Sequence, residues 1–199
     1  MTPETLTALL TPYATVTPSL ASQLLTYLDL ILKWNARFNL TAIRTPEDIV
    51  RRHFGESLFA AAHLGPCATL LDYGSGAGFP GLPIQLLRPD VQVTLAESRA
   101  KKAAFLHEAV RTLHLPTEIW PHRVESMAGN RTFDTVTLRA VDHMPAAIAA
   151  AALRATHKLL ILSTLSSHSH PSLPPNFTLD PPIPLPESHG AALLIAHRR

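Results

Sequence analysis

The sequence is poor in cysteine, in charge and in long apolar runs. Cys67 is the one cysteine among 199 residues, which excludes an internal disulfide framework and a cysteine-based zinc cluster. No stretch of about 18 uncharged apolar residues occurs, and the N-terminal residues lack the basic region and apolar run of a signal peptide. We therefore expect a protein of the cytoplasm, in a reducing environment.

Charge is balanced as well as sparse. Charged residues make up 16% of the chain and the formal net charge is +2, so overall charge neither requires nor excludes a nucleic-acid partner. Hydrophobic residues make up 46%, which is typical of a globular protein, and the 18 prolines then belong mostly in loops and at the ends of elements. The length fits one domain covering residues 1–199.

The hydrophobic pattern divides that domain into two subregions. Apolar residues recur at helical spacing over residues 19–34 and 46–64, which predicts a helical N-terminal subregion of residues 1–65. Residues 66–199 instead alternate short apolar runs with helical stretches. The pattern predicts strands at 68–73, 91–97, 117–121, 134–139 and 158–163, and helices at 81–87, 99–115 and 145–156. Such alternation predicts an α/β fold with a parallel sheet.

Two details follow from local sequence. Ser98 is expected to cap the helix that begins at residue 99. The stretch of residues 166–186, rich in Ser, His and Pro, is expected to be a mobile or extended connection. The apolar runs at residues 177–179 and 191–196 are expected to pair as an antiparallel edge of the sheet.

The segment LLDYGSGAGFPG, residues 70–81, carries the strongest functional signal. It leaves an apolar strand, crosses a glycine turn and opens a helix, an arrangement that lets backbone amides approach a nucleotide-like cofactor. Two registers compete: Asp-x-Gly-x-Gly-x-Gly from Asp72, and the dinucleotide pattern Gly-x-Gly-x-x-Gly from Gly76. The second requires its first glycine directly after the strand, and a carboxylate at the strand end suits a cationic amino-acid group better than a pyrophosphate. Methyltransferase chemistry is therefore favoured, with NAD(P) binding and a purely structural turn as alternatives.

Glu97 supports the same interpretation. It ends the second predicted strand, where an adjacent carboxylate can accept both hydroxyls of an adenosine ribose. The alternative is an acidic residue that favours the start of the following helix through the helix dipole.

These residues resemble the RsmG family, also called glucose-inhibited division protein B. The similarity extends over about residues 20–145 in consistent order, and several stretches are more specific than the glycine loop. They are Trp34-Asn35, Phe38-Asn39-Leu40-Thr41, His53-Phe54 with Ser57-Leu58, the loop of residues 72–83, Arg88-Pro89, Glu97-Ser98 with Lys101, Phe105-Leu106, Arg123-Val124-Glu125, and Phe133-Asp134 leading to Arg139-Ala140.

The resemblance implies a Rossmann-like class I methyltransferase sheet with N-terminal helices beside the site. It also implies S-adenosyl-L-methionine as cofactor and N7 of a guanine in 16S ribosomal RNA as the methylated atom. Cofactor contacts of the family fall on Gly74, Phe79, Val124, Glu125 and Arg139. Arg139 is the one candidate for positioning substrate or cofactor, and no catalytic residue is assigned.

The chemistry is consistent with that target. N7 of guanine has a lone pair and no proton to remove, so positioning and electrostatics can supply catalysis without a general base. A cytosine C5 enzyme needs an attacking cysteine, yet Cys67 precedes the first strand, away from the glycine loop. Enzymes that methylate exocyclic amines commonly carry an Asn/Asp-Pro-Pro-aromatic motif after the fourth strand, where this chain reads LRAV, residues 138–141.

Basic side chains are candidates for contacts to RNA, whereas the histidines do not predict a metal site. Arg123, Lys101 and Lys102 are candidates for phosphate contacts, together with a basic group of Lys33, Arg37, Arg44, Arg51 and Arg52. His168 and His170 lack a carboxylate at ligand spacing and are interpreted as surface residues, so no metal is expected. We expect a monomer that acts on 16S ribosomal RNA or the small ribosomal subunit.

The chain departs from the family at the end of the fifth strand. Family members usually have a Lys-Gly pair there, whereas this chain reads Ser163-Thr164. A methyltransferase of the same fold acting on another RNA, a small molecule or a protein is therefore an alternative, as is a noncatalytic RNA- or cofactor-binding protein.

Overall fold

A single mixed sheet organises the described part of the chain. The computed structural model describes residues 1–164, 172–188 and 190–199. Its strands are β1 (Thr69–Tyr73), β2 (Gln92–Ala96), β3 (Glu118–Trp120), β4 (Phe133–Arg139), β5 (Ala155–Thr164), β6 (Phe177–Leu179), β7 (Ile183–Pro184) and β8 (Ala191–Arg198). The order is β3-β2-β1-β4-β5-β8-β6, with β7 beside β8. Strands β1 to β5 are parallel and β8 runs antiparallel to β5, which confirms the predicted α/β class.

The helices precede the sheet or cross between its strands. They are α1 (Pro3–Leu10), α2 (Pro18–Asn35), α3 (Pro46–Asp48), the π-helix η1 (Ile49–Gly55), α4 (Glu56–Ala62), α5 (Gly81–Leu87), α6 (Ala100–Thr112), the 3₁₀ turn η2 (Val124–Ser126) and α7 (Met144–Arg154). Among the described residues, no helix combines the length and apolar character that crossing a membrane requires.

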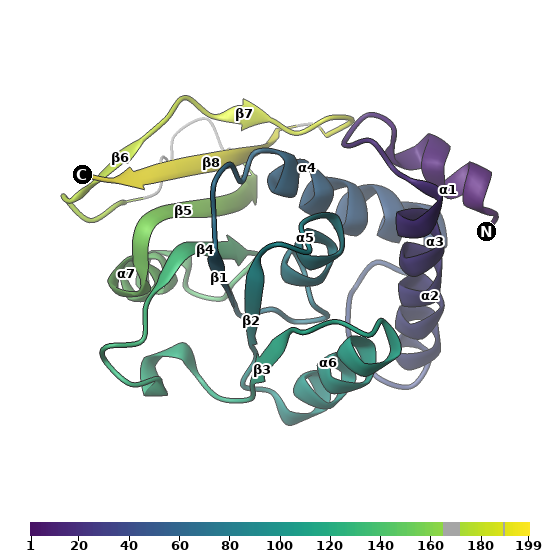
Figure 1. Ribbon diagram of the computed structural model, residues 1–199, viewed down its shortest axis with the longest axis horizontal. Helices are drawn as coiled ribbons and strands as arrows, with labels where there is room; N and C mark the ends of the chain where they lie inside the picture. The colour runs from purple at the N-terminus through teal and green to yellow at the C-terminus, as the bar shows by residue number, and fades with distance from the viewer. Residues whose placement is uncertain (165–171, 189) are drawn as a thin grey trace.

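The two faces of the sheet are buried by different helices. Leu70 and Leu160 belong to one core cluster, with residues of α2, α4, α5 and α6. Leu71 and Leu159, their neighbours in sequence, belong to the other cluster, with residues of α7 and η2. Side chains alternate between faces along a strand, so consecutive leucines supply both cores. Figure 1 shows this division, with α7 at the left of the view and α2 and α6 at the right.

Most predicted elements form within one or two residues of their expected ends. The expected antiparallel edge is confirmed, because β6 pairs with β8. The helix predicted at 46–64 is interrupted by the π-helical turn of η1. Helix α1 was not predicted, although Thr2 caps it with its side chain and proline follows.

One capping prediction is wrong. The N-cap of α6 is Arg99 rather than Ser98, and no side chain caps this helix from the N-cap position. A carboxylate oxygen of Glu97 instead accepts the Arg99 amide hydrogen at 2.7 Å. His168 and His170 lie outside the described residues, while residues 172–186 contain β6 and β7.

Candidate functional site

A cavity of about 780 Å³ opens at the carboxyl ends of the parallel strands. The strand order reverses next to β1, where β2 lies on one side and β4 on the other. In open α/β sheets this reversal point is where ligands bind. The cavity is lined by Tyr73, Gly74, Ala96, Glu97, Ser98, Arg99, Lys102, His122, Arg123, Val124, Glu125, Ala140, Val141, Asp142, His143, Ala146 and Ala147.

The glycine loop forms one wall of this cavity. Gly74 has a φ of +70°, a left-handed conformation that side-chain-bearing residues rarely adopt. Gly78 has a φ of +91°, and a Cβ atom there would come within 2.5 Å of the Tyr27 hydroxyl oxygen. The same hydroxyl donates a hydrogen bond to the carbonyl of Ala77. Tyr27 of α2 therefore packs against the glycine turn at Ala77 and Gly78.

Glu97 is placed at the end of β2, on the cavity wall. One carboxylate oxygen accepts the Gly76 amide at 3.0 Å and the other accepts the Arg99 amide at 2.7 Å. The residue is buried and lines the cavity together with Gly74. Its carboxylate is thus held in place between the glycine loop and α6, with lone pairs left over for a ligand.

Glu125 and Val124 lie on the same cavity beyond β3. The Tyr73 hydroxyl donates a hydrogen bond to a carboxylate oxygen of Glu125 at 2.5 Å. That hydrogen bond lowers the pKa of Glu125, while burial and the same contact raise the pKa of Tyr73. Val124 is buried in the core shared with α7, so one residue supplies an apolar wall and its neighbour a carboxylate.

Asp72 does not face the cavity, contrary to the idea that its carboxylate meets a cationic amino-acid group. It is fully buried and accepts hydrogen bonds from the Gly81 amide at 3.1 Å and the Thr137 hydroxyl at 2.9 Å. Burial raises its pKa to about 6, although the hydrogen bond from Thr137 opposes the shift. The carboxylate ties the start of α5 to β4 and so shapes the loop from behind.

Phe79 and Arg139 lie outside the lining of the large cavity. Phe79 is 6% exposed and stacks on the His53 ring, with the two centroids 4.6 Å apart. Arg139 pairs with Glu56, with Nη2 and Oε2 2.8 Å apart. Four of the six predicted cofactor residues therefore meet at one cavity, and these two meet beside it, against the N-terminal helices.

The loop after β4 belongs to the site, although the sequence did not indicate it. Residues 140–143 all line the cavity, and Ala140 and His143 have φ values of +49° and +53°. Residues other than glycine are strained when their backbone is in the left-handed conformation, and such residues cluster at functional sites. Arg99 reaches Asp142 from the other side, with Nη2 and Oδ2 3.4 Å apart. The family resemblance reaches only Arg139-Ala140, and Asp142 and His143 carry no glycine or motif signal.

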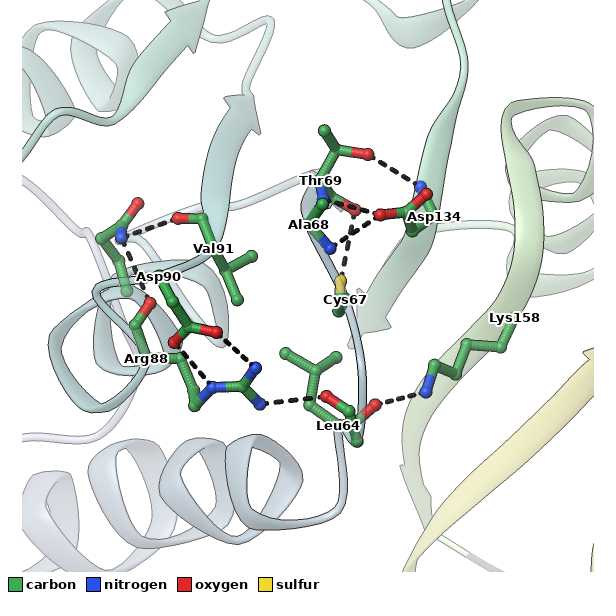
Figure 2. A network of polar contacts seen from close by, with 11 residues as sticks. Leu64, Cys67, Ala68, Thr69, Arg88, Asp90, Val91, Asp134 and Lys158 are labelled. Atoms are coloured by element: carbon green, nitrogen blue, oxygen red, sulfur yellow. Dashed lines mark hydrogen bonds and ion pairs between the residues drawn. The ribbon is translucent and has the colours of Figure 1, made fainter.

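Cys67 lies at the opposite end of the parallel strands from the cavity, just before β1. Its thiol donates to the Thr69 carbonyl at 3.3 Å, and burial raises the pKa of the thiol. Figure 2 shows the surrounding network, in which Asp134 accepts the Thr69 amide at 2.9 Å and Lys158 donates to the carbonyl of Leu64. The amino ends of the strands lie here, whereas the glycine loop follows the carboxyl end of β1. The cysteine therefore has no access to the cavity.

The doubly wound sheet, the glycine loop at its switch point and the carboxylate that ends β2 define a class I S-adenosylmethionine-dependent methyltransferase. A family model described as "GidB: rRNA small subunit methyltransferase G" matches residues 20–168. The chain belongs to this family, as the sequence motifs predicted.

Relatives in the same family carry one name. The ribosomal RNA small subunit methyltransferase G of Xanthomonas axonopodis pv. citri is 37% identical over 185 residues, which cover 90% of this chain and 87% of that protein. The protein of the same name from Nitrosomonas europaea is 49% identical over 126 residues, covering 62% of this chain and 58% of its own length.

Solved structures share the fold at low identity. Magnesium protoporphyrin IX methyltransferase from Synechocystis, with bound SAM, gives a TM-score of 0.64 at 14% identity, covering 87% of this chain and 97% of that one. A 16S rRNA N2 G1207 methyltransferase from T. thermophilus, in complex with AdoMet and guanosine, gives 0.53 at 20% identity, covering 73% and 42%. Both confirm the predicted Rossmann-like methyltransferase fold.

Proposed function

We propose that this chain transfers a methyl group from S-adenosylmethionine to N7 of a guanine in 16S ribosomal RNA. The observation that carries the proposal is the convergence of Gly74, Glu97, Val124 and Glu125 on one cavity at the switch point of the sheet. Family membership supplies the class of substrate, small-subunit ribosomal RNA.

The residues of the cavity fit the cofactor chemically. When bound, S-adenosylmethionine supplies a methyl group on a sulfonium. A volume of about 780 Å³ falls within the range of small-molecule sites, roughly 300–1,000 Å³. Glu97 offers a fixed carboxylate for ribose hydroxyls, and Val124 and Glu125 offer an apolar wall and an acceptor for the adenine. The positive-φ backbone at Gly74 leaves room for the methionine part.

The reaction requires the protein mainly to position the guanine and the cofactor relative to each other. N7 of guanine attacks through its own lone pair, so no side chain has to remove a proton. The protein's contribution is to hold the base in line and to keep water away. Arg139 suits the first task, because its guanidinium lies at the end of β4 and is one residue from the cavity-lining Ala140. A donor placed on N7 itself would block the lone pair, so Arg139 positions substrate or cofactor by other atoms.

Basic side chains that line the cavity support an RNA substrate. Arg99, Lys102 and Arg123 line it, and all three can hold phosphates. Next to Lys102, Lys101 extends over the ring of Phe38, with its Nζ 5.2 Å from the centroid. Phe38 is 37% exposed, unlike most large apolar residues of the chain. A cation beside an open aromatic ring suits a single-stranded nucleotide.

The domain organisation, oligomeric state and location of the protein are part of the same proposal. We propose one domain, with helices over residues 1–65 and the cofactor-binding core over 66–199. A shared core supports it, because Leu24 and Leu28 of α2 pack in the same cluster as Leu70 of β1. We also propose a monomer that works in the cytoplasm on the small subunit or its RNA.

Label transfer from S-adenosyl-[methyl-³H]methionine tests the function. Small subunits and protein-free 16S RNA that lack the modification are incubated with the protein. The product is then reduced with sodium borohydride and cleaved with aniline at N7-methylguanine. We expect incorporation at one guanine. Incorporation only into another RNA, a protein or a small molecule would contradict 16S ribosomal RNA as the substrate. Cofactor binding with no transfer to any of them would contradict the proposed enzymatic activity.

A further inference from the structure

We infer that His53 is a positioning residue that holds the Arg139 guanidinium in one orientation at the end of β4. The inference rests on the proposed function, because it deepens the role of Arg139 in that reaction. Its evidence is a network of hydrogen bonds from the π-helix η1, the following helix α4 and the loop after α2.

The first observation is the number of partners around Arg139. Its Nε and Nη2 donate to Glu56 Oε2 at 3.3 and 2.8 Å, and Nη2 also donates to the Arg52 carbonyl at 2.9 Å. Its Nη1 lies 2.8 Å from Nδ1 of His53. Described residues thus engage four of the five N–H groups of the guanidinium, and one N–H on Nη1 is left for a substrate.

The second observation fixes the tautomer of His53. A guanidinium can only donate, so Nδ1 must accept, and the ring proton must then be on Nε2. Nε2 lies 2.7 Å from the Thr41 hydroxyl oxygen, which accepts it and also accepts the Ile43 amide at 3.2 Å. A protonated ring would place two donors face to face at Nδ1. The network therefore requires a neutral imidazole with one defined orientation.

Burial keeps the ring neutral. His53 is 8% exposed, and its pKa is lowered to about 3 by burial, by Arg139 and by Arg52. The ring also stacks on Phe79 at an interplanar angle of 21°. The His53 ring is thus held on one face by Phe79 of the glycine loop and by hydrogen bonds at both of its nitrogens.

The third observation is the location of the network. Glu56 and Arg52 line a second cavity of about 280 Å³, whereas Ala140, next to Arg139, lines the large one. The guanidinium therefore binds residues of the second cavity, while the main chain of Arg139 continues into the loop that lines the large one. Its partners come from the end of a π-helical turn, a feature that is rare in proteins and frequent at functional sites. A histidine in this turn that only filled space would not need an acceptor aimed at the guanidinium.

Two substitutions separate positioning from packing. His53→Phe keeps the ring and its stacking but removes the acceptor, whereas His53→Asn keeps an acceptor at the δ position and loses the ring. If His53 orients Arg139, His53→Phe lowers kcat at least about 10-fold on small subunits, with the Kd for S-adenosylmethionine within about 3-fold of wild type. His53→Asn recovers most of that kcat despite its smaller side chain.

A second readout does not depend on catalysis. The Arg139 side-chain Nε–Hε signal in a ¹⁵N NMR spectrum, assigned by Arg139→Lys, is expected to stay resolved in His53→Asn and to broaden or shift in His53→Phe. Wild-type kcat and an unchanged signal in His53→Phe would overturn the inference, as would a His53→Asn variant that is as impaired as His53→Phe. If the wild type transfers no methyl group to ribosomal RNA, the proposed function fails while the NMR result still decides the positioning role.

Should His53→Phe fail to fold, Thr41→Val removes the partner of Nε2 and is expected to give the same changes to a smaller degree. No change in either readout would overturn the inference.

Discussion

The Glu56 carboxylate at the start of α4 and the Arg139 guanidinium at the end of β4 form an ion pair, with Oε2 and Nη2 2.8 Å apart. Their side chains are only 11% and 14% exposed, so solvent screens this pair weakly. The pair joins the N-terminal helices to the sheet at the point where substrate is expected. It therefore acts on stability and on the geometry of the site together.

The stability losses from removing the two members of this pair should not be additive. Glu56→Ala leaves the guanidinium of Arg139 without its counter-ion, and we expect a loss of about 3 kcal/mol in the free energy of unfolding. Glu56→Ala with Arg139→Met should lose less than the sum of the two single variants, because no uncompensated charge is left. Urea unfolding measures both, with the exposed α2 residue Asp29 changed to alanine as control. Strictly additive losses would mean that the pair contributes nothing.

Gly74 tests the cofactor loop. Gly74→Asp adds a carboxylate to the cavity wall at a φ of +70°, which side chains rarely adopt. We expect S-adenosylmethionine binding to become undetectable in calorimetry while the fold survives. Gly129→Asp makes the same chemical change at an exposed glycine whose added Cβ would meet nothing within 4 Å, and it should bind like wild type. Wild-type affinity in Gly74→Asp would refute the assignment of the loop.

Glu97 has a structural task and a proposed ligand task, and two variants separate them. Glu97→Ala removes the acceptor for the Gly76 and Arg99 amides, so we expect cofactor affinity to fall about 100-fold. Glu97→Gln keeps one carbonyl acceptor and should lose about 10-fold. A Kd for adenosine measured alongside checks the ribose role, because a purely structural glutamate would weaken methionine-side and adenosine-side ligands equally.

Cys67 should be dispensable for the reaction. Its thiol lies at the amino ends of the strands, with Asp134 and Lys158 nearby (Figure 2). Cys67→Ser should retain kcat and KM on small subunits and lose at most about 1 kcal/mol of stability. A large loss of kcat with an intact fold would instead support a covalent mechanism, which this geometry opposes.

The sheet and the glycine loop could be predicted because their signals are local. Alternating leucines such as Leu70 and Leu71 face opposite cores, and glycines mark the turn at the end of β1. The α/β class and the methyltransferase family therefore followed from the sequence. The start of α1 carries a signal of the same local kind, because Thr2 caps the helix and proline follows it.

The rest of the site depends on tertiary contacts that no local pattern encodes. His53 and Arg139 are 86 residues apart in sequence and meet because β4 ends against the π-helical turn. A π-helical turn differs from an α-helical turn by one residue in its hydrogen bonds, so the periodicity at residues 46–64 could not separate them. Phe79 reads as an apolar cover for a ligand, yet in the fold its ring is covered by His53. The assignment of Phe79 and Arg139 as cofactor residues stays a prediction.

His53 should make the free energy of unfolding fall as the pH drops below about 6.5. Its pKa is lowered to about 3 in the folded state and is about 6.5 in an unfolded chain. Between these values the unfolded chain binds a proton that the folded chain does not, so protonation favours unfolding and stability is lost as the pH falls. Asp72 acts in the opposite direction, because its raised pKa of about 6 lets the folded state take up a proton first.

The two effects are separated by comparing variants rather than by the wild-type curve alone. Relative to wild type, His53→Phe and His53→Asn should each gain about 2 kcal/mol in free energy of unfolding on going from pH 7 to pH 5. A constant difference across that range would mean that the pKa of His53 is the same in the folded and unfolded states, which the Arg139 contact opposes.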